Sequence, residues 1–196
     1  MLASITPLGE RGRQSRWGLT MTAFALAAGA AGAAAGALAG ALGGLAIGPV
    51  LGTRGRLAML ALALLAAALV DLLPGAAPGP RRQVNERWLD EFRGWVYGAG
   101  FGAQLGLGAT TVVASAATYV ALVAAALSAS PASGALIVGG FGAVRGLTPL
   151  LAARVHTPGA LLELHRRFAA WQPRARWATV AVLAVSAMLA GAASLP

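Results

Sequence analysis

The chain of 196 residues contains no cysteine and no lysine, and it has only six acidic residues. Without cysteine it can form no disulfide, thiolate metal site or thiol redox pair of its own. All 15 basic residues are arginine, and the formal net charge is +9. A basic excess in a soluble protein would suggest nucleic acid. Here the arginines lie in short segments beside apolar runs, as in membrane proteins, so we expect no nucleic-acid partner.

Charged side chains are absent from two long stretches. The first covers 37 residues from Trp17 to Thr53, and the second covers 51 residues from Gly94 to Val144. A helix of ~20 apolar residues spans the ~30 Å hydrocarbon core of a bilayer. The stretches lack the alternation of transmembrane strands and the polar faces of a soluble domain. The sequence therefore predicts an all-α, polytopic transmembrane helical bundle, with a single membrane domain over residues 1–196.

Five spans are expected from the positions of the apolar segments. They cover residues 17–46, 56–73, 94–127, 133–153 and 177–195. The third span is longer than the ~20 residues that a bilayer requires, so it must tilt, protrude or break. Five spans place the two termini on opposite sides of the membrane.

Arginines in the connecting segments are distributed unevenly between the two sides of this bundle. Twelve lie on the side of the N-terminus: Arg11, Arg13, Arg16, Arg81, Arg82, Arg87, Arg93, Arg154, Arg166, Arg167, Arg174 and Arg176. The other side has only Arg54 and Arg56. Positively charged segments stay inside, so we expect a cytoplasmic N-terminal segment over residues 1–16 and an external C-terminus. The Ala, Gly and Arg bias suggests a bacterial protein of the inner (cytoplasmic) membrane.

An amphipathic helix is predicted over residues 157–172, before the last span. Thr157 and Pro158 have the residue types of a helix N-cap and first helical position. Large apolar side chains then recur at helical spacing, opposite charged ones: Leu161, Leu164, Phe168 and Trp171. Pro173 is expected to end this helix, which we predict to lie on the inner membrane surface.

Glycine recurs at every fourth position in the first and third spans. The two sets are Gly32, Gly36, Gly40 and Gly44, and Gly98, Gly102 and Gly106. This spacing places each set on one helix face, where another backbone can approach closely. Tight helix packing is the expected role. Alternatively, the glycines between residues 98 and 108 form a break or hinge, since each interior glycine costs ~0.5–1 kcal/mol relative to alanine.

Polar side chains follow the glycines of the third span. Gln104, Thr111, Ser115 and Thr118 fall along one helical stripe, with Thr110 alongside. Each hydroxyl alone could simply bond to its own helix backbone. Together, beside a weak point in an overlong helix, they are candidates to line a hydrated path or a substrate site.

Arg145 is the one charge well inside an apolar segment. An intramembrane arginine costs ~2.5–3.5 kcal/mol or more on insertion scales, so it should face protein, water or a counter-ion. Pro149 follows four residues later, and its ring would kink the helix and free the carbonyl of Arg145. We therefore add Arg145 and Pro149 to the substrate-path candidates. Alternatively, Arg145 extends toward the cytoplasm or pairs structurally with Asp71, at the end of the second span.

Known catalytic patterns are absent from the sequence. It contains no Ser/His/Asp grouping, no phosphate-binding loop and no H-E-x-x-H motif. His156 and His165 have no carboxylate or second histidine at ligand spacing. We expect no enzyme activity, no catalytic residues, no metal site and no cofactor.

Two stretches carry a resemblance to a known family. They are Gly98-Ala-Gly-Phe-Gly-Ala-Gln-Leu-Gly-Leu-Gly-Ala-Thr-Thr-Val112 and Arg145-Gly-Leu-Thr-Pro-Leu-Leu151. The order of features resembles the transmembrane domain of the CcdA/DsbD thiol–disulfide electron transporters, in the LysE-like transporter group. The first stretch is similar to the family's fourth helix, where a glycine-rich run leads into Thr-Pro-Cys. Thr110 matches, while Thr111 and Val112 replace the proline and cysteine. The second is similar to the Gly-Leu-Pro kink of the fifth helix.

This resemblance implies a scaffold of two inverted three-helix repeats around a mid-membrane site, here in degenerate form. The family's first helix, with its Ser-Pro-Cys, has no counterpart, and the second cysteine is replaced, so the family's thiol chemistry is not expected from this chain alone. We expect an in-frame extension upstream of Met1 to encode ~20 apolar residues that end in a Ser-Pro-Cys-like turn.

Two functions follow as expectations. The first is a permease that translocates a small solute or ion across the lipid bilayer. The alternative is a non-transporting membrane subunit or assembly factor, including one for cytochrome or thiol-protein maturation with cysteines supplied in trans. An odd number of spans leaves a repeat interface exposed, so we also expect a homo-oligomer or a membrane partner protein.

Reporter fusions test the predicted topology. Alkaline phosphatase fused after Pro196 should be active, because the arginine-rich loops hold the opposite side of the bundle in the cytoplasm. The same enzyme inserted in the 154–176 loop should be inactive. An inactive fusion at Pro196 would contradict the five-span topology.

Overall fold

The computed structural model describes residues 5–73, 77, 79, 88–108, 113 and 115–196. Helices are the regular elements of these residues, and the described part of the chain contains no strand. The all-α prediction is therefore confirmed. The α-helices are α1 (Pro7–Gly12), α2 (Trp17–Ala46), α3 (Thr53–Leu72), α4 (Trp88–Glu91), α5 (Gly94–Gly106), α6 (Ala117–Leu127), α7 (Pro131–Gly146) and α8 (Pro158–Ser194), and a 3₁₀-helix, η1 (Thr148–Ala152), follows α7.

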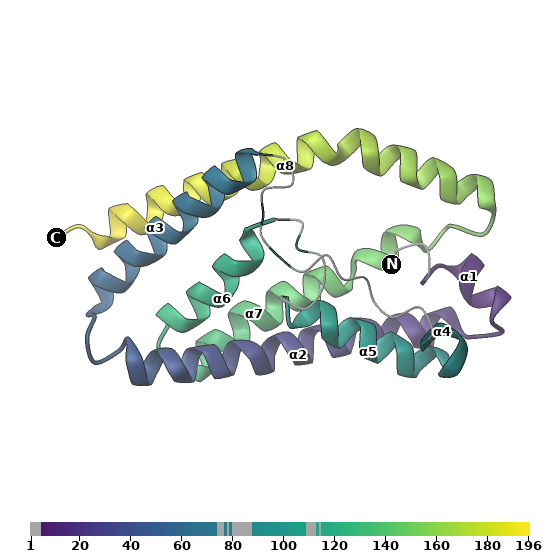
Figure 1. The fold of residues 1–196 in the computed structure, drawn as a ribbon, viewed down its shortest axis with the longest axis horizontal. Helices are drawn as coiled ribbons and strands as arrows, with labels where there is room; N and C mark the ends of the chain where they lie inside the picture. The colour runs from purple at the N-terminus through teal and green to yellow at the C-terminus, as the bar shows by residue number, and fades with distance from the viewer. Residues whose placement is uncertain (1–4, 74–76, 78, 80–87, 109–112, 114) are drawn as a thin grey trace.

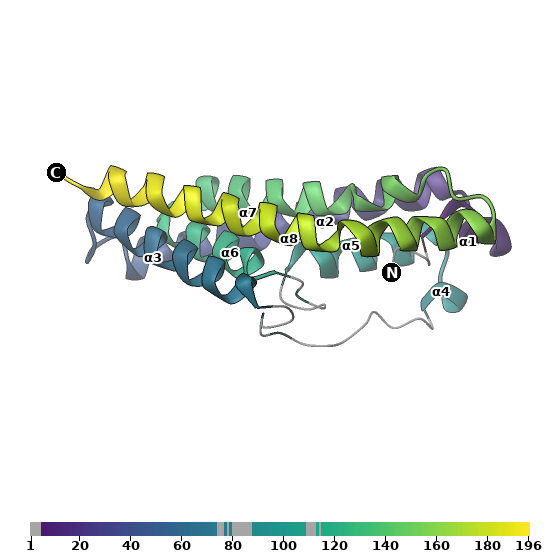
Figure 2. The ribbon, with the colours of Figure 1, turned by 90° about the horizontal axis from the view of Figure 1, so that it is seen from above.

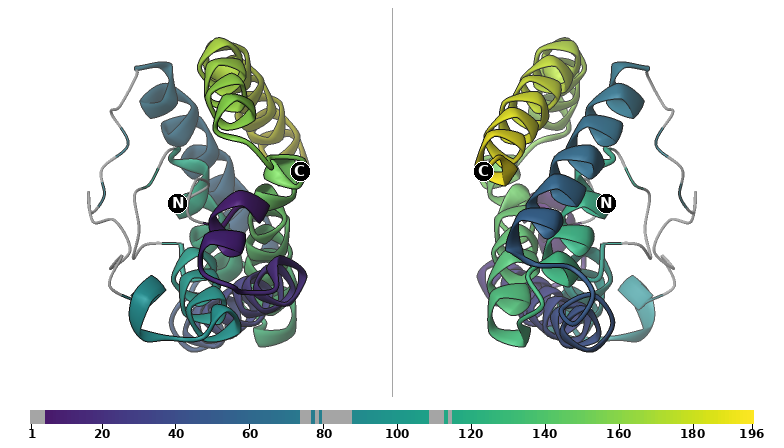
Figure 3. Two further views of the ribbon diagram at one scale, coloured as in Figure 1. Left: turned by 90° about the vertical axis from the view of Figure 1, so that its right-hand side faces the viewer. Right: turned by 90° about the vertical axis from the view of Figure 1, so that its left-hand side faces the viewer.

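The helices form two packed groups. The long helix α2 packs against α5 in its first half, against α7 over its middle and against α6 near its C-terminal end. The second group is the pair α3 and α8. The end-on views in Figure 3 show this pair on one side of the α2 group. Helix α6 contacts α2, α3 and α7, and so joins the two groups.

The same N-cap pattern begins three of these helices. Thr6, Ser130 and Thr157 each accept a hydrogen bond from a first-turn backbone N–H, and a proline follows each of them. A hydroxyl at the N-cap satisfies a backbone donor that the helix itself cannot, and proline suits the next position because its missing N–H is not needed there.

Four of the described helical segments are long and apolar enough to cross a membrane. They are Trp17–Ala46, Thr53–Leu72, Pro131–Ala152 and Pro158–Ser194. Large apolar side chains on them point outward: Leu38 is 67% exposed and Leu136 is 77% exposed. Small residues fill much of the interior, as in membrane helix bundles. These helices are compatible with an integral membrane protein.

The third expected span, residues 94–127, is not one continuous helix, so the structure does not confirm five full-length spans. Helix α5 ends at Gly106, Gly108 has a positive φ of 78°, and α6 begins only at Ala117. With 13 and 11 residues, the two helices are about 20 Å and 17 Å long at ~1.5 Å per residue. Each is shorter than the ~30 Å hydrocarbon core. The overlong segment therefore breaks just after its glycine cluster.

A second correction concerns the end of the chain. Pro173 does not end a separate helix over residues 157–172, because α8 continues through it for 37 residues. An internal proline removes one backbone hydrogen bond and crowds one carbonyl, but its ring here lies on an exposed part of the helix. The intact turns on both sides keep the helix continuous. That residues 157–172 lie on the membrane surface stays a prediction.

Glycines allow α2 to approach its neighbours closely. A Cβ added at Gly32, Gly36 or Gly40 would lie within 3.0 Å of a carbonyl oxygen of α7 or of its N-cap, Ser130. A Cβ added at Gly98, Gly102 or Gly106 would meet carbonyl oxygens of α2 just as closely. Gly44 is less tightly packed, 3.1 Å from the Ala129 carbonyl oxygen by the same measure. Each glycine set therefore faces a neighbouring backbone.

Several of the described loop arginines lie at one end of the molecule, in or beside α1 and the starts of α5 and α8: Arg11, Arg13, Arg16, Arg93 and Arg154. Helix α1 and the starts of α5 and α8 lie at this end, whereas the α2–α3 turn and the C-terminus lie at the other (Figure 1). The topology and the side that faces the cytoplasm both stay predictions. Arg81, Arg82 and Arg87 lie outside the described residues.

A pair of glycine substitutions tests the close packing. Gly36→Ala should destabilise the protein by ~1–3 kcal/mol, because the new methyl group collides with the backbone of α7. The control is Gly140→Ala, since a Cβ added at Gly140 meets nothing within 4 Å and alanine favours the helix by up to ~1 kcal/mol. Thermal unfolding in detergent measures both. Equal stability of the two variants would refute the packing role of Gly36.

Candidate functional site

The break between α5 and α6 exposes two helix ends inside the bundle. The last carbonyls of α5 and the first N–H groups of α6 have no partner within their own helices. The two ends carry partial charges of opposite sign, negative at the end of α5 and positive at the start of α6. Inside a bilayer such groups need partners from protein or water. The structure places a charged side chain of suitable sign at each end.

Arg145 lies at the C-terminal end of α5. Its Nη1 donates to the carbonyl oxygen of Leu105 at 3.4 Å, and its guanidinium carbon lies 5.5 Å from the ring centroid of Phe141. The side chain is half-buried and comes from the last turn of α7. Arg145 thus faces another helix and complements the negative end of α5.

Asp71 lies at the N-terminal end of α6. Its Oδ2 accepts a hydrogen bond from the Ser115 hydroxyl at 2.5 Å, and its Oδ1 accepts one from the Ala116 N–H at 2.9 Å. The side chain is only 7% exposed. Asp71, from the last turn of α3, therefore caps the second half of the broken helix.

The expected pairing of Arg145 with Asp71 is not found. The ion pairs of the described residues join Glu10 to Arg13 and Glu163 to Arg166 and Arg167, and none joins Arg145 to Asp71. The physical reason is that each side chain serves a different helix end. Both Asp71 oxygens are satisfied at α6, whereas Arg145 is bonded at α5.

Helix α3 also caps the other end of α6. Arg56, near the start of α3, donates from Nη1 to the carbonyl oxygens of Leu127 and Ser128, at 3.5 and 3.2 Å. An acid at the start of α6 and a base at its end both complement the helix dipole. Helix α3 therefore stabilises both ends of α6 with charged side chains.

Pro149 lies just after the end of α7. The α-helix ends at Gly146, and the chain continues as the 3₁₀-helix η1 with Pro149 in its first turn. Proline has no N–H to donate to the Arg145 carbonyl, and the Thr148 hydroxyl donates to that carbonyl instead. The carbonyl oxygen of Arg145 therefore keeps a hydrogen-bond partner despite the kink.

The remaining candidates are divided between the two sides of the break. Gln104 is half-buried in the last turn of α5, and Thr118 is buried in the first turn of α6. A Cβ added at Gly108 would lie 2.9 Å from the Thr118 methyl carbon, so the chain passes close to Thr118 as it leaves α5. Thr110 and Thr111 lie outside the described residues.

A buried polar cluster around Glu10 is the feature that sequence reasoning missed. Glu10 is 0% exposed, and its carboxylate pairs with Arg13 at 2.9 Å. It also accepts hydrogen bonds from the Thr20 hydroxyl at 2.8 Å and from the Tyr97 hydroxyl. The cluster ties α1 to α2 and α5. Its only signal in the sequence was one acid among three arginines in residues 1–16, without helical periodicity.

The guanidinium of Arg13 remains protonated in this cluster. Burial alone would lower its pKa, but hydrogen bonds to Glu10 and Tyr97 outweigh that effect and raise the pKa above its usual value. An arginine is charged at physiological pH in any case. Arg13 therefore stays charged, and its contact with Glu10 holds the turn between α1 and α2 in place.

Comparisons with other proteins add no family assignment. No family model matches the chain, and neither the curated proteins nor the solved structures give a match. Within the described residues, no group of three or more His, Cys, Asp or Glu side chains is placed to hold a metal ion. The geometry of the α5–α6 break is therefore the basis for a proposed function.

Replacing Asp71 tests the cap on α6. Asp71→Ala should destabilise the protein by ~1–3 kcal/mol, because the Ala116 N–H and the Ser115 hydroxyl lose their buried acceptor. Hydrogen exchange should speed up in the first turn of α6. The matched control is Glu163→Ala, which removes an acid with exposed ion pairs on α8 and should change stability by less than ~0.5 kcal/mol. A stable Asp71→Ala protein with unchanged exchange would refute the cap.

Proposed function

We propose that the chain is an integral membrane permease that moves a small solute or ion past the break between α5 and α6. One observation carries this proposal: an interrupted helix whose two ends are each held by a charged side chain from another helix, Arg145 from α7 and Asp71 from α3. Discontinuous helices with exposed ends form the substrate and ion sites of many secondary transporters.

The two helix ends offer binding groups of opposite character. Carbonyl oxygens at the end of α5 suit a cation, and N–H groups at the start of α6 suit an anion or a carboxylate. A guanidinium has five N–H donors, yet among the described residues Arg145 makes one hydrogen bond, a long one. Its remaining donors are available to water or to a passing solute.

The family resemblance supports the same location. The two stretches that resemble the CcdA/DsbD transmembrane domain meet here, since Arg145 in one donates to Leu105 in the other. In that family these helices surround a mid-membrane site between inverted repeats. The chain has no cysteine, so the proposal covers the scaffold and its path, with no thiol transfer and no enzymatic step.

A membrane subunit or assembly factor is the second candidate, and the surface of α8 favours it. In its first half most side chains are exposed, including Trp171 at 63%. Its buried residues Leu183, Ala187 and Ala190 lie in the second half, packed with α3. A second copy of the chain or a partner protein would cover the exposed half. The mass of the detergent-solubilised complex tests this candidate.

The absence of cysteine makes the proposed path directly testable. In a single-cysteine variant the introduced thiol is the only one present. Ser115→Cys and Thr118→Cys should react in intact membranes with a small, membrane-impermeant thiol reagent, because the permease proposal requires water at the break. The control Leu189→Cys lies on an exposed apolar part of α8 and should stay unreactive in lipid. Unreactive thiols at both Ser115 and Thr118 would refute a hydrated path.

Flux measurements then distinguish the two candidates. Purified protein in liposomes should increase the leak of protons, Na⁺, K⁺ or chloride, each followed with its own indicator. Arg145→Leu should abolish the flux of the conducted ion but change thermal unfolding only slightly, because the lost hydrogen bond to the Leu105 carbonyl is a long one and the uncharged residue avoids the desolvation cost of arginine. Full activity of Arg145→Leu would refute its role in the path. The subunit candidate gains support if none of the four ions moves and the protein purifies with a stoichiometric partner.

A further inference from the structure

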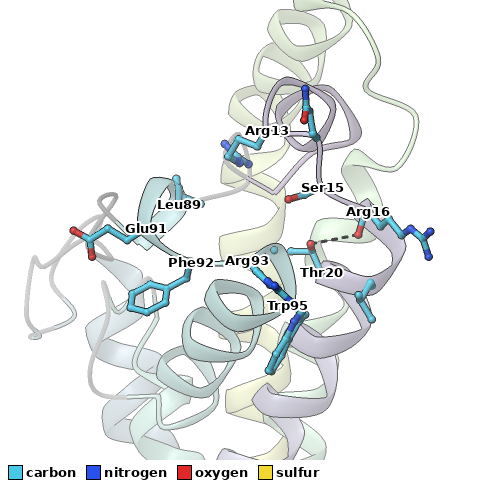
Figure 4. A pocket seen from close by; sticks show the side chains of 12 residues that line it. Arg13, Ser15, Arg16, Thr20, Leu89, Glu91, Phe92, Arg93 and Trp95 are labelled. Carbon is cyan, nitrogen blue, oxygen red and sulfur yellow. Dashed lines mark hydrogen bonds between the residues drawn. The ribbon is translucent and has the colours of Figure 1, made fainter.

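An open pocket of about 640 Å³ lies at the arginine-rich end of the molecule, apart from the α5–α6 break. The α1–α2 turn, α4 and the start of α5 surround it (Figure 4). Its lining includes three arginines, Arg13, Arg16 and Arg93, and one acid, Glu91. The transport proposal assigns no role to this pocket.

Among the described residues, the arginines of the pocket outnumber the acids that pair with them. Arg13 is paired with Glu10. Arg16 and Arg93 are exposed, and within the described residues neither forms an ion pair. Glu91 lies at one edge in Figure 4, with its carboxylate directed away from Arg93. Among the described residues, Arg16 and Arg93 thus have no ion-pair partner, so this part of the molecule attracts anions.

The pocket is built on a rigid frame. The Glu10 cluster fixes Arg13 through the Thr20 and Tyr97 hydroxyls of α2 and α5. Ser15 supplies a hydroxyl to the lining, and a Cβ added at Gly94 would lie 3.1 Å from its Oγ. The first residue of α5 therefore sits directly beside this hydroxyl. The N–H groups of an arginine guanidinium and the hydroxyl of a serine can both donate hydrogen bonds to the oxygens of a phosphate group.

Aromatic and apolar side chains complete the lining. Trp95 is 49% exposed and Phe92 is 46% exposed, and Leu19 lines the pocket beside them. In Figure 4 Arg93 lies between Ser15 above and the Trp95 ring below. Tryptophan is enriched at the level of lipid head groups, and basic pockets on the cytoplasmic side of membrane proteins bind acidic head groups. The pocket therefore offers polar groups next to apolar side chains, as a lipid-binding site does.

We propose that this pocket binds a phosphate group, carried either by an anionic phospholipid of the adjacent leaflet or by a soluble phosphate compound. The Arg93 guanidinium contacts the phosphate and Ser15 donates a hydrogen bond. The Arg16 guanidinium points away from Arg93 in Figure 4, so Arg16 adds only long-range attraction. With a lipid, the acyl chains lie along Leu19, Phe92 and Trp95. The site is independent of the proposed transport path.

The test uses the purified full-length chain in a neutral detergent. Binding of phosphatidylglycerol, phosphatidylcholine, glycerol phosphate and inorganic phosphate is followed by thermal shift and by native mass spectrometry. We expect phosphatidylglycerol to raise the unfolding temperature and to stay bound, and phosphatidylcholine to do neither. Should glycerol phosphate or inorganic phosphate produce the shift without the lipid, the ligand is the soluble phosphate.

Matched arginine variants separate the pocket from general surface charge. Arg93→Gln, alone or with Arg16→Gln, should weaken binding by at least about tenfold, since charge-assisted hydrogen bonds to the phosphate are lost. The control is the pair Arg174→Gln and Arg176→Gln, which removes two arginines of the same predicted side outside the pocket and should leave binding within about twofold. Because Arg16 and Arg93 are exposed, their variants should fold, and unfolding in the absence of ligand checks this.

Three outcomes would overturn the proposal. One is that none of the four probes binds. Another is that phosphatidylcholine binds as well as phosphatidylglycerol, which would show that the pocket does not select a ligand with net negative charge, since both lipids carry a phosphate. The third is that the control pair weakens binding as much as the pocket variants, which would attribute the effect to overall charge.

Discussion

Close backbone contact between α2 and its neighbours is the constraint on which the rest of the structure depends. In lipid, apolar side chains gain little by packing on one another, so helices associate where small residues let their backbones meet. Glycines provide this contact on both sides of α2, at Gly36 against α7 and at Gly102 of α5 against α2. Because α5 and α7 are both fixed to α2, the end of α5 is brought within reach of Arg145.

The same glycines that allow this packing weaken α5 as a helix. Its run ends at Gly106, and Gly108 takes a backbone conformation with φ of 78° that other residues adopt only under strain. The break then creates unpaired backbone groups, which the fold satisfies with side chains from elsewhere. Asp71 and Arg56 on α3 hold the two ends of α6, and Arg145 holds the end of α5. The glycines that allow close packing thus favour the break, and the break explains why charged side chains lie at the helix ends.

Two polar regions result, with different characters. At the break, charged side chains complement helix ends and retain unused donors, which is the basis of the permease proposal. At the arginine-rich end, the Glu10 cluster is closed, since Arg13, Thr20 and Tyr97 all contact the buried carboxylate. It fixes the frame of a pocket whose remaining arginines are open to an anion. One region is suited to movement of a solute and the other to a bound ligand.

The sequence by itself determined the helical class, the extent of α2, the approximate position of α3 and the glycine faces, because each follows from local composition and spacing. It offered the break near Gly98–Gly108 only as an alternative to tight packing. It misjudged Pro173, since one lost hydrogen bond does not end a helix with intact turns on both sides. Only the tertiary structure decided the partners. Asp71 meets Ser115, Arg145 meets Leu105 and Glu10 meets Tyr97 across 44, 40 and 87 positions of sequence. Such pairs depend on how the helices pack in three dimensions, which spacing within one helix does not encode.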